Sequence, residues 1–161
     1  MCVKKTISLV FSYMFFAKVR IRSEVNLLIL MKKRKAMKIF RIIIQEHLRK
    51  KWHIVISETS IIGSIVLPHP HNVVIGREAV IGENCTIYHD VTIGQNKNLF
   101  PKIGNNVIIY PGAKLIGGIS IGDNVVIGAN AVVTTNIPDN AIIGGIPAKI
   151  IRYRNSKDVF S

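Results

Sequence analysis

The side chains best suited to proton transfer in this chain are its histidines, because imidazole has an unperturbed pKa of about 6.5. There are five of them: His47, His53, His69, His71 and His89. The first two lie on or just after a predicted helix, and we interpret them as structural or solvated. Two others occur in Pro68-His69-Pro70-His71, where the prolines restrict the backbone around the imidazoles. The candidates for a general base are therefore the three histidines after residue 68.

Metal and covalent chemistry find little support in the sequence. The His-x-His pair at 69 and 71 has no accompanying Cys or Glu ligand set, so we expect no metal. Phosphate-loop, dinucleotide-binding and nucleophile-elbow motifs are absent. With only Cys2 and Cys85 the chain can form at most one disulfide, which fits a reducing compartment. Cys85 falls on an inward position of the repeat described next, which predicts a core residue and not an acyl carrier.

The second half of the chain repeats with a period of six residues. The repeated aliphatic positions are Ile75, Ile81, Ile87, Ile93, Ile103, Ile109, Leu115, Ile121, Ile127 and Val133. Neither a helix nor an alternating strand repeats on six, whereas a triangular prism of short strands and corners does. We predict a parallel β-helix over residues 56–137 with these residues inward and Gly or Asn at corners of positive φ. The period is interrupted between Ile93 and Ile103, which predicts a protruding loop at 95–100.

The repeat leaves the environment of His69 open. Counting back six residues from Ile75 places His69 on the inward frame, as a core histidine. However, Ile56 and Ile62 follow a register shifted by one, so the frame is unreliable there, and an exposed His69 is the alternative. His89 has a non-core position in its hexad and is either in the same cleft or solvated.

Charge divides the chain into two parts. Residues 1–53 contain fourteen Lys or Arg against two acids, a net charge of +12, out of +13 for all 161 residues. An amphipathic helix is predicted over 41–52, and one or two more within 6–30. The basic run Lys32-Lys33-Arg34-Lys35 is either solvated or a surface for anionic lipid. Nucleic-acid binding is not expected, because no recognition motif accompanies the charge.

These features define three segments. We predict a basic helical N-terminal segment at 1–53, a β-helix domain at 54–151 and a basic tail at 152–161. The apolar stretch at 7–17 is too short to span a bilayer, and no signal cleavage site follows it. We therefore expect a cytoplasmic protein whose N-terminal segment could contact the inner face of the membrane.

The repeat and its flanking motifs resemble the hexapeptide-repeat acyltransferases, which fold as left-handed parallel β-helices. Within them, Leu67-Pro68-His69 with Pro101-Lys102-Ile103-Gly104 downstream is similar to the serine acetyltransferases. The resemblance implies that His69 is the catalytic base. From their positions near it in the sequence, His71 and His89 are the acceptor-site candidates. The resemblance also implies acetyl-CoA as acyl donor, bound between subunits of a homotrimer. The cofactor-binding positions carried over are Thr134, Thr135, Lys149 and Arg152.

The sequence departs from the serine acetyltransferases on the acceptor side. Two Asp positions of those enzymes correspond here to Pro68 and Val55, and an Arg-His pair corresponds to Leu99-Phe100. These departures favour an O-acetyltransferase that acts on a sugar or surface-polysaccharide precursor. Serine O-acetylation in cysteine biosynthesis is the alternative, and a non-catalytic trimeric β-helix is a third interpretation. Apolar outward residues such as Val74, Val80, Ile108 and Val126 support a homotrimer, because water would otherwise cover them.

Overall fold

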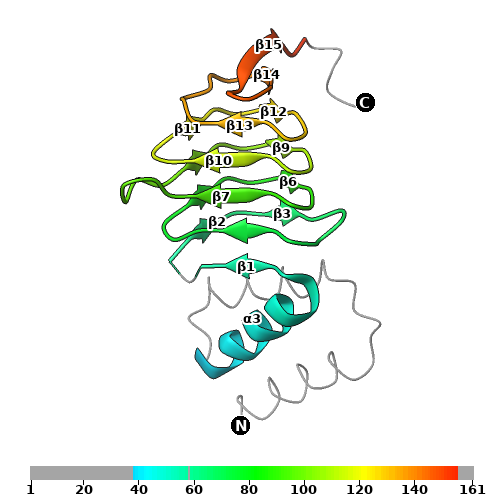
Figure 1. Cartoon of the computed structure of the whole chain (residues 1–161), viewed down its shortest axis with the longest axis vertical. Helices are drawn as coiled ribbons and strands as arrows, with labels where there is room; N and C mark the ends of the chain where they lie inside the picture. The colour runs from blue at the N-terminus through cyan, green and yellow to red at the C-terminus, as the bar shows by residue number, and fades with distance from the viewer. Residues whose placement is uncertain (1–37, 58, 156–161) are drawn as a thin grey trace.

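The computed structural model describes residues 38–57 and 59–155, which form one helix followed by a prism of stacked coils (Figure 1). The helix α3 (Lys38–Trp52) matches the predicted helix at 41–52 and extends it at its start. It lies across the lower end of the prism, where Ile44 and Leu48 are buried with Ile54 and Ile56 of the first coil. The helices predicted within residues 6–30 and the run at 32–35 fall outside the described residues.

Three parallel sheets form the walls of the prism, with strands two to five residues long. The first wall contains β1 (Val55–Ile56), β4 (Val74–Ile75), β7 (Thr92–Gly94), β10 (Lys114–Ile116) and β13 (Val132–Val133). The second wall contains β2 (Ile61–Ile62), β5 (Val80–Ile81), β8 (Lys102–Ile103) and β11 (Ser120–Ile121). The third wall contains β3 (Ile65–Val66), β6 (Cys85–Ile87), β9 (Ile108–Ile109), β12 (Val126–Ile127), β14 (Ala141–Gly144) and β15 (Lys149–Tyr153). The last strand is antiparallel to β14 and closes the upper end.

The predicted inward residues form the core. Ile75 pairs with Ile93 and Ile109 with Ile127, so equivalent residues of successive coils lie on one another. All ten repeated aliphatic residues are at most 3% exposed, and Cys85 is buried among them. Each coil therefore covers the apolar face of the next, as the six-residue period predicted. The prediction of a mainly β fold, a parallel β-helix after a helical segment, is confirmed.

The corners differ in part from the prediction. Asparagine does adopt positive φ there, at residues 84, 106, 124, 130 and 140 among others, and so do Gly112 and Gly117. The glycines that follow the inward aliphatic residues serve close packing instead: a Cβ on Gly82 would lie 2.6 Å from the backbone oxygen of Gly104. Side chains are excluded from those positions by the neighbouring coil, while short polar side chains tolerate the left-handed conformation.

We name the three corners by their residues. The histidine corner, between the third and first walls, comprises residues 67–73, 88–91, 110–113 and 128–131. The loop corner, between the first and second walls, comprises 57, 59–60, 76–79, 95–101, 117–119 and 134–136. The asparagine corner, between the second and third walls, comprises 63–64, 82–84, 104–107, 122–125 and 138–140. Each set follows from the strand bounds given above.

Candidate active site

His69 lies exposed at the histidine corner, and the core-histidine interpretation is wrong. The inward residue of this coil is Leu67, which is 4% exposed, and the next buried residue is Val73. The equivalent residues one coil later, Ile87 and Val91, are two positions closer together in sequence. Two additional residues therefore lengthen the corner at Pro68-His69-Pro70-His71 and place the imidazole outside the prism.

Aromatic rings from the following coils surround His69. Its ring centroid is 6.1 Å from that of Tyr88 and 6.3 Å from that of His89, which it meets edge-on. Tyr88 in turn stacks on Tyr110 of the third coil, with centroids 5.3 Å apart and planes 9° from parallel. Within the described part of the chain the imidazole nitrogens of His69 form no hydrogen bond. They remain available to a substrate hydroxyl.

The other two candidate histidines of this corner differ in direction. His89 lies next to His69 at this corner, and its Nε2 lies 4.0 Å from Oδ2 of Asp90. His71 is turned toward the helix, because its Nδ1 lies 3.3 Å from the carbonyl oxygen of Trp52 and its ring is 5.4 Å from that of His53. Of the two acceptor-site candidates, His89 is thus the one the structure brings to His69.

The remaining histidines and the cysteine belong to other parts of the molecule. His47 and His53 are exposed on α3 and at its end, where His53 has a φ of 55°. Burial raises the pKa of the Cys85 thiol, whose Sγ donates to the carbonyl oxygen of Gly104 at 3.2 Å. Among the residues that the structure describes, no group of three or more His, Cys, Asp or Glu side chains is arranged to hold a metal ion.

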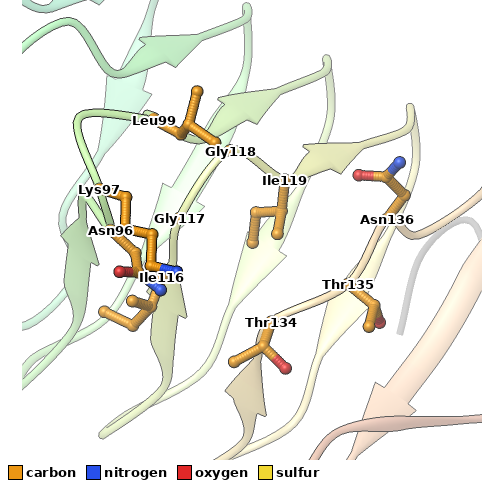
Figure 2. Close-up of a pocket in the computed structure, with 10 residues that line it drawn as sticks. All are labelled: Asn96, Lys97, Leu99, Ile116, Gly117, Gly118, Ile119, Thr134, Thr135 and Asn136. Carbon is orange, nitrogen blue, oxygen red and sulfur yellow. The ribbon is translucent and has the colours of Figure 1, made fainter.

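A cavity of about 470 Å³ opens at the loop corner (Figure 2). It lies between the loop at 95–100 and two later turns of the same corner, and its lining residues are Asn96, Lys97, Leu99, Ile116, Gly117, Gly118, Ile119, Thr134, Thr135 and Asn136. The loop protrudes as predicted, and it is closed by reciprocal backbone hydrogen bonds between Asn96 and Leu99 across two residues of positive φ. Thr134 and Thr135, two predicted cofactor contacts, are therefore part of a built cavity.

The predicted basic contacts lie at the upper end of the prism. Lys149 and Arg152 are exposed on β15. The backbone N–H of Ala148 donates to the carbonyl oxygen of Val132 at 2.8 Å, which places the turn before Lys149 against the strand that leads to Thr134. The structure thus gathers the four cofactor candidates near the last coils, while His69 lies in the first coil at another corner.

Several residues of these sites were missed from the sequence. Tyr88 and Tyr110 stand where most hexads have glycine, directly after the inward Ile87 and Ile109, and that substitution was the available signal. The contribution of residues 116–119 to the cavity had no such signal, because it depends on how the loop at 95–100 folds onto the next coil. Leu99, for example, lies against Gly118.

Known proteins resemble this chain in sequence and in fold. The family described as bacterial transferase hexapeptide (six repeats) matches residues 100–135. A serine acetyltransferase of Synechococcus elongatus is 42% identical over 95 residues, which cover 56% of this chain and 38% of the relative. The chain therefore spans less than half the length of that curated relative.

Solved structures match a larger share of the chain than the curated relative does. A Brucella abortus serine acetyltransferase in complex with coenzyme A is 30% identical with a TM-score of 0.73, covering 83% of this chain and 55% of the other. A Neisseria gonorrhoeae serine acetyltransferase in complex with serine is 30% identical with a TM-score of 0.69, covering 78% and 54%. These findings confirm the resemblance to hexapeptide-repeat acyltransferases of the serine acetyltransferase type and the left-handed β-helix fold.

Proposed function

We propose that this left-handed β-helix protein, similar to the serine acetyltransferases, is an acetyl-CoA-dependent O-acetyltransferase. The observation that carries the proposal is the exposed His69 at a lengthened corner of a fold that matches those enzymes, including coenzyme A and serine complexes. A non-catalytic β-helix would have no need of an imidazole held between two prolines and facing open solvent. The relatives' names supply the reaction class, and the corner supplies a base for it.

His69 acts in this proposal as the general base. Its imidazole takes the proton from the acceptor hydroxyl while the hydroxyl oxygen attacks the thioester carbonyl of acetyl-CoA. The C–S bond then breaks, the acetyl group stays on the acceptor oxygen, and the proton passes from the imidazolium to the departing thiolate. Tyr88 and His89 limit the directions from which an acceptor can reach the imidazole.

The donor half of the site fits coenzyme A in its chemistry. The cavity at the loop corner offers the hydroxyls of Thr134 and Thr135 and the ammonium of Lys97 beside apolar Leu99 and Ile119. Lys149 and Arg152 add exposed positive charge at the same end of the prism, where it can pair with the phosphates of the cofactor. These residues would hold the donor, and His69 would act on the acceptor.

The arrangement of the two halves supports a homotrimer. His69 belongs to the histidine corner and Thr134 to the loop corner, and the first wall separates these corners within one chain. A threefold axis parallel to the prism would set the histidine corner of one protomer against the loop corner of the next. Each active site would then be completed by two protomers, and partly exposed apolar residues of the walls would be covered, among them Val74 and Ile108.

The comparisons favour L-serine over a sugar as the acceptor. The relatives and structural neighbours reported above are serine acetyltransferases, so serine O-acetylation is better supported than the polysaccharide-precursor hypothesis that the sequence put first. The departures that suggested a sugar persist in the structure: Pro68 is exposed and Val55 is 42% exposed in β1, and neither side chain offers a carboxylate. A sugar acceptor therefore stays the second candidate.

A cytoplasmic location, at the inner face of the membrane, is proposed from charge alone. The last turn of α3 carries Arg49, Lys50 and Lys51, all exposed, which supports a peripheral contact with anionic lipid at the inner face of the membrane. Among the residues that the structure describes, no helix is long and apolar enough to cross a bilayer.

The proposed function is tested by thiol release from acetyl-CoA with the full chain. We expect release to depend on L-serine and to exceed the release with monosaccharides and oligosaccharides at equal concentration. Release that depends only on a sugar would replace serine by the second candidate. Absence of release with every hydroxyl acceptor would contradict the transferase proposal itself.

A further inference from the structure

Asp90 is the single carboxylate that the described residues place at the histidine corner. Glu46 lies on α3, where it pairs with Arg49 at 2.8 Å, and Glu78 lies at the loop corner. The other described acids belong to the asparagine corner, where their side chains accept backbone N–H groups: Glu83, Asp123 and Asp139. Within one protomer, the negative charge that the described residues can bring near His69 therefore comes from Asp90.

The carboxylate of Asp90 is held by the coil that carries His69. Its Oδ1 accepts a hydrogen bond from Nδ2 of Asn72 at 2.6 Å, and its backbone N–H donates to the carbonyl oxygen of His71 at 3.0 Å. Oδ2 faces the His89 ring, which itself meets the His69 ring edge-on. The side chain is 50% exposed, so a fixed carboxylate remains open to a ligand at this corner.

A cation is bonded to the backbone of the same residue. Nζ of Lys114, at the start of β10, donates to the backbone carbonyl oxygen of Asp90 at 2.5 Å. An ammonium group has three donors, and this hydrogen bond uses one of them. The corner therefore presents a carboxylate with open acceptor sites and an ammonium with open donors, both anchored to Asp90.

We propose that Asp90 and Lys114 form the acceptor subsite and recognise the zwitterion of a hydroxy α-amino acid. The ammonium of the ligand binds the Asp90 carboxylate, its carboxylate binds Lys114, and its hydroxyl is directed to His69. The inference rests on the proposed transferase function and assigns the residues that recognise its acceptor. Asp90 supplies, from the following coil, the carboxylate that Pro68 and Val55 do not provide. A neutral sugar would require neither charge.

Conservative variants separate the two charges while retaining the fold. Asp90→Asn keeps an acceptor for Asn72 and suits the left-handed φ of 58°. Lys114→Gln keeps a donor for the Asp90 carbonyl. Glu83→Gln is the matched control, because Glu83 is an exposed corner carboxylate at the asparagine corner and Gln keeps an acceptor for the backbone N–H of Ser64. Each is measured as the full chain by calorimetric titration and by thiol-release kinetics.

Three probes report on the two charges: L-serine, L-serine methyl ester, which lacks the carboxylate, and 3-hydroxypropanoate, which lacks the ammonium. Asp90→Asn should raise the Kd and KM for L-serine and its ester about 10- to 100-fold and leave 3-hydroxypropanoate unchanged. Lys114→Gln should weaken L-serine and 3-hydroxypropanoate and leave the ester unchanged. Glu83→Gln should match the wild type for all three probes.

The outcomes distinguish this inference from the proposed function. Equal weakening of all three probes by Asp90→Asn would show a merely structural role and overturn the subsite. Serine acetylation by the wild type that is insensitive to Asp90→Asn would overturn the subsite and leave the transferase function standing. Serine binding that depends on Asp90 without any acetylation would support the subsite and contradict the function.

Discussion

The histidine corner and the asparagine corner are built on the same hexads but differ in how regularly their polar side chains repeat from coil to coil. At the asparagine corner, amides of successive coils bond to each other: Nδ2 of Asn106 donates to Oδ1 of Asn124, and Nδ2 of Asn124 to Oδ1 of Asn140, both at 3.2 Å. At the histidine corner, the corresponding residues change in type from coil to coil, and the imidazole of His69 faces solvent. Repetition at a corner stabilises the stack, whereas departure from the repeat leaves groups available to a ligand.

The contrast between a corner that stabilises the stack and one that is open to a ligand is tested first at Gly104, in the asparagine corner. We expect the largest effect on stability there. A Cβ there would lie 2.8 Å from the backbone carbon and oxygen of Gly122, and backbone cannot move aside as a flexible side chain can. Gly104→Ala should lower the free energy of unfolding by about 1–3 kcal/mol. Gly76→Ala, whose nearest contact would be 3.1 Å, should cost less. Urea denaturation at fixed protein concentration measures both, and equal losses would contradict the account.

A smaller effect on stability is expected at Asn124, which has a φ of 58°. Two substitutions there separate the contribution of the backbone conformation from that of the side-chain hydrogen bonds. Asn124→Gly removes the two amide hydrogen bonds but keeps the left-handed conformation accessible. Asn124→Ala removes the same bonds and adds about 1–2 kcal/mol for the conformation itself. The alanine variant should therefore unfold at lower urea concentration than the glycine variant, while the rate of thiol release by the folded protein stays at the wild-type value. A large loss of activity in the glycine variant would show that the asparagine corner takes part in the chemistry.

The two corners also show how far the sequence predicts this molecule. The inward ladder from Ile75 to Val133 and the loop at 95–100 follow from the period, because burial repeats wherever coils have equal length. The exposed environment of His69 could not be predicted from the period, because the six-residue repeat fails where the histidine corner gains two residues before Val73. The pairing of Asp90 with Asn72 and Lys114 depends on three coils meeting at one corner, and spacing along the chain does not determine which side chains turn toward each other.

The donor half of the site was predictable only through the resemblance. Thr134, Thr135, Lys149 and Arg152 have no distinguishing pattern in the repeat, yet the structure places the two threonines in the cavity and the two basic residues on β15. Their contact with coenzyme A stays a prediction. The separation of this half from His69 by the first wall is the structural result that makes assembly part of the proposed mechanism.

The central claim is that the histidine corner performs the chemistry through His69. The most direct test is the steady-state kinetics of His69→Ala with acetyl-CoA and the acceptor identified by the thiol-release assay. Loss of a general base should lower kcat by about 10²- to 10⁴-fold while the KM for acetyl-CoA stays nearly unchanged, because the imidazole acts on the acceptor proton. His71→Ala, whose ring faces α3, is the matched control and should cost less. Full activity in His69→Ala would contradict the assignment and transfer the role of base to His89 or His71.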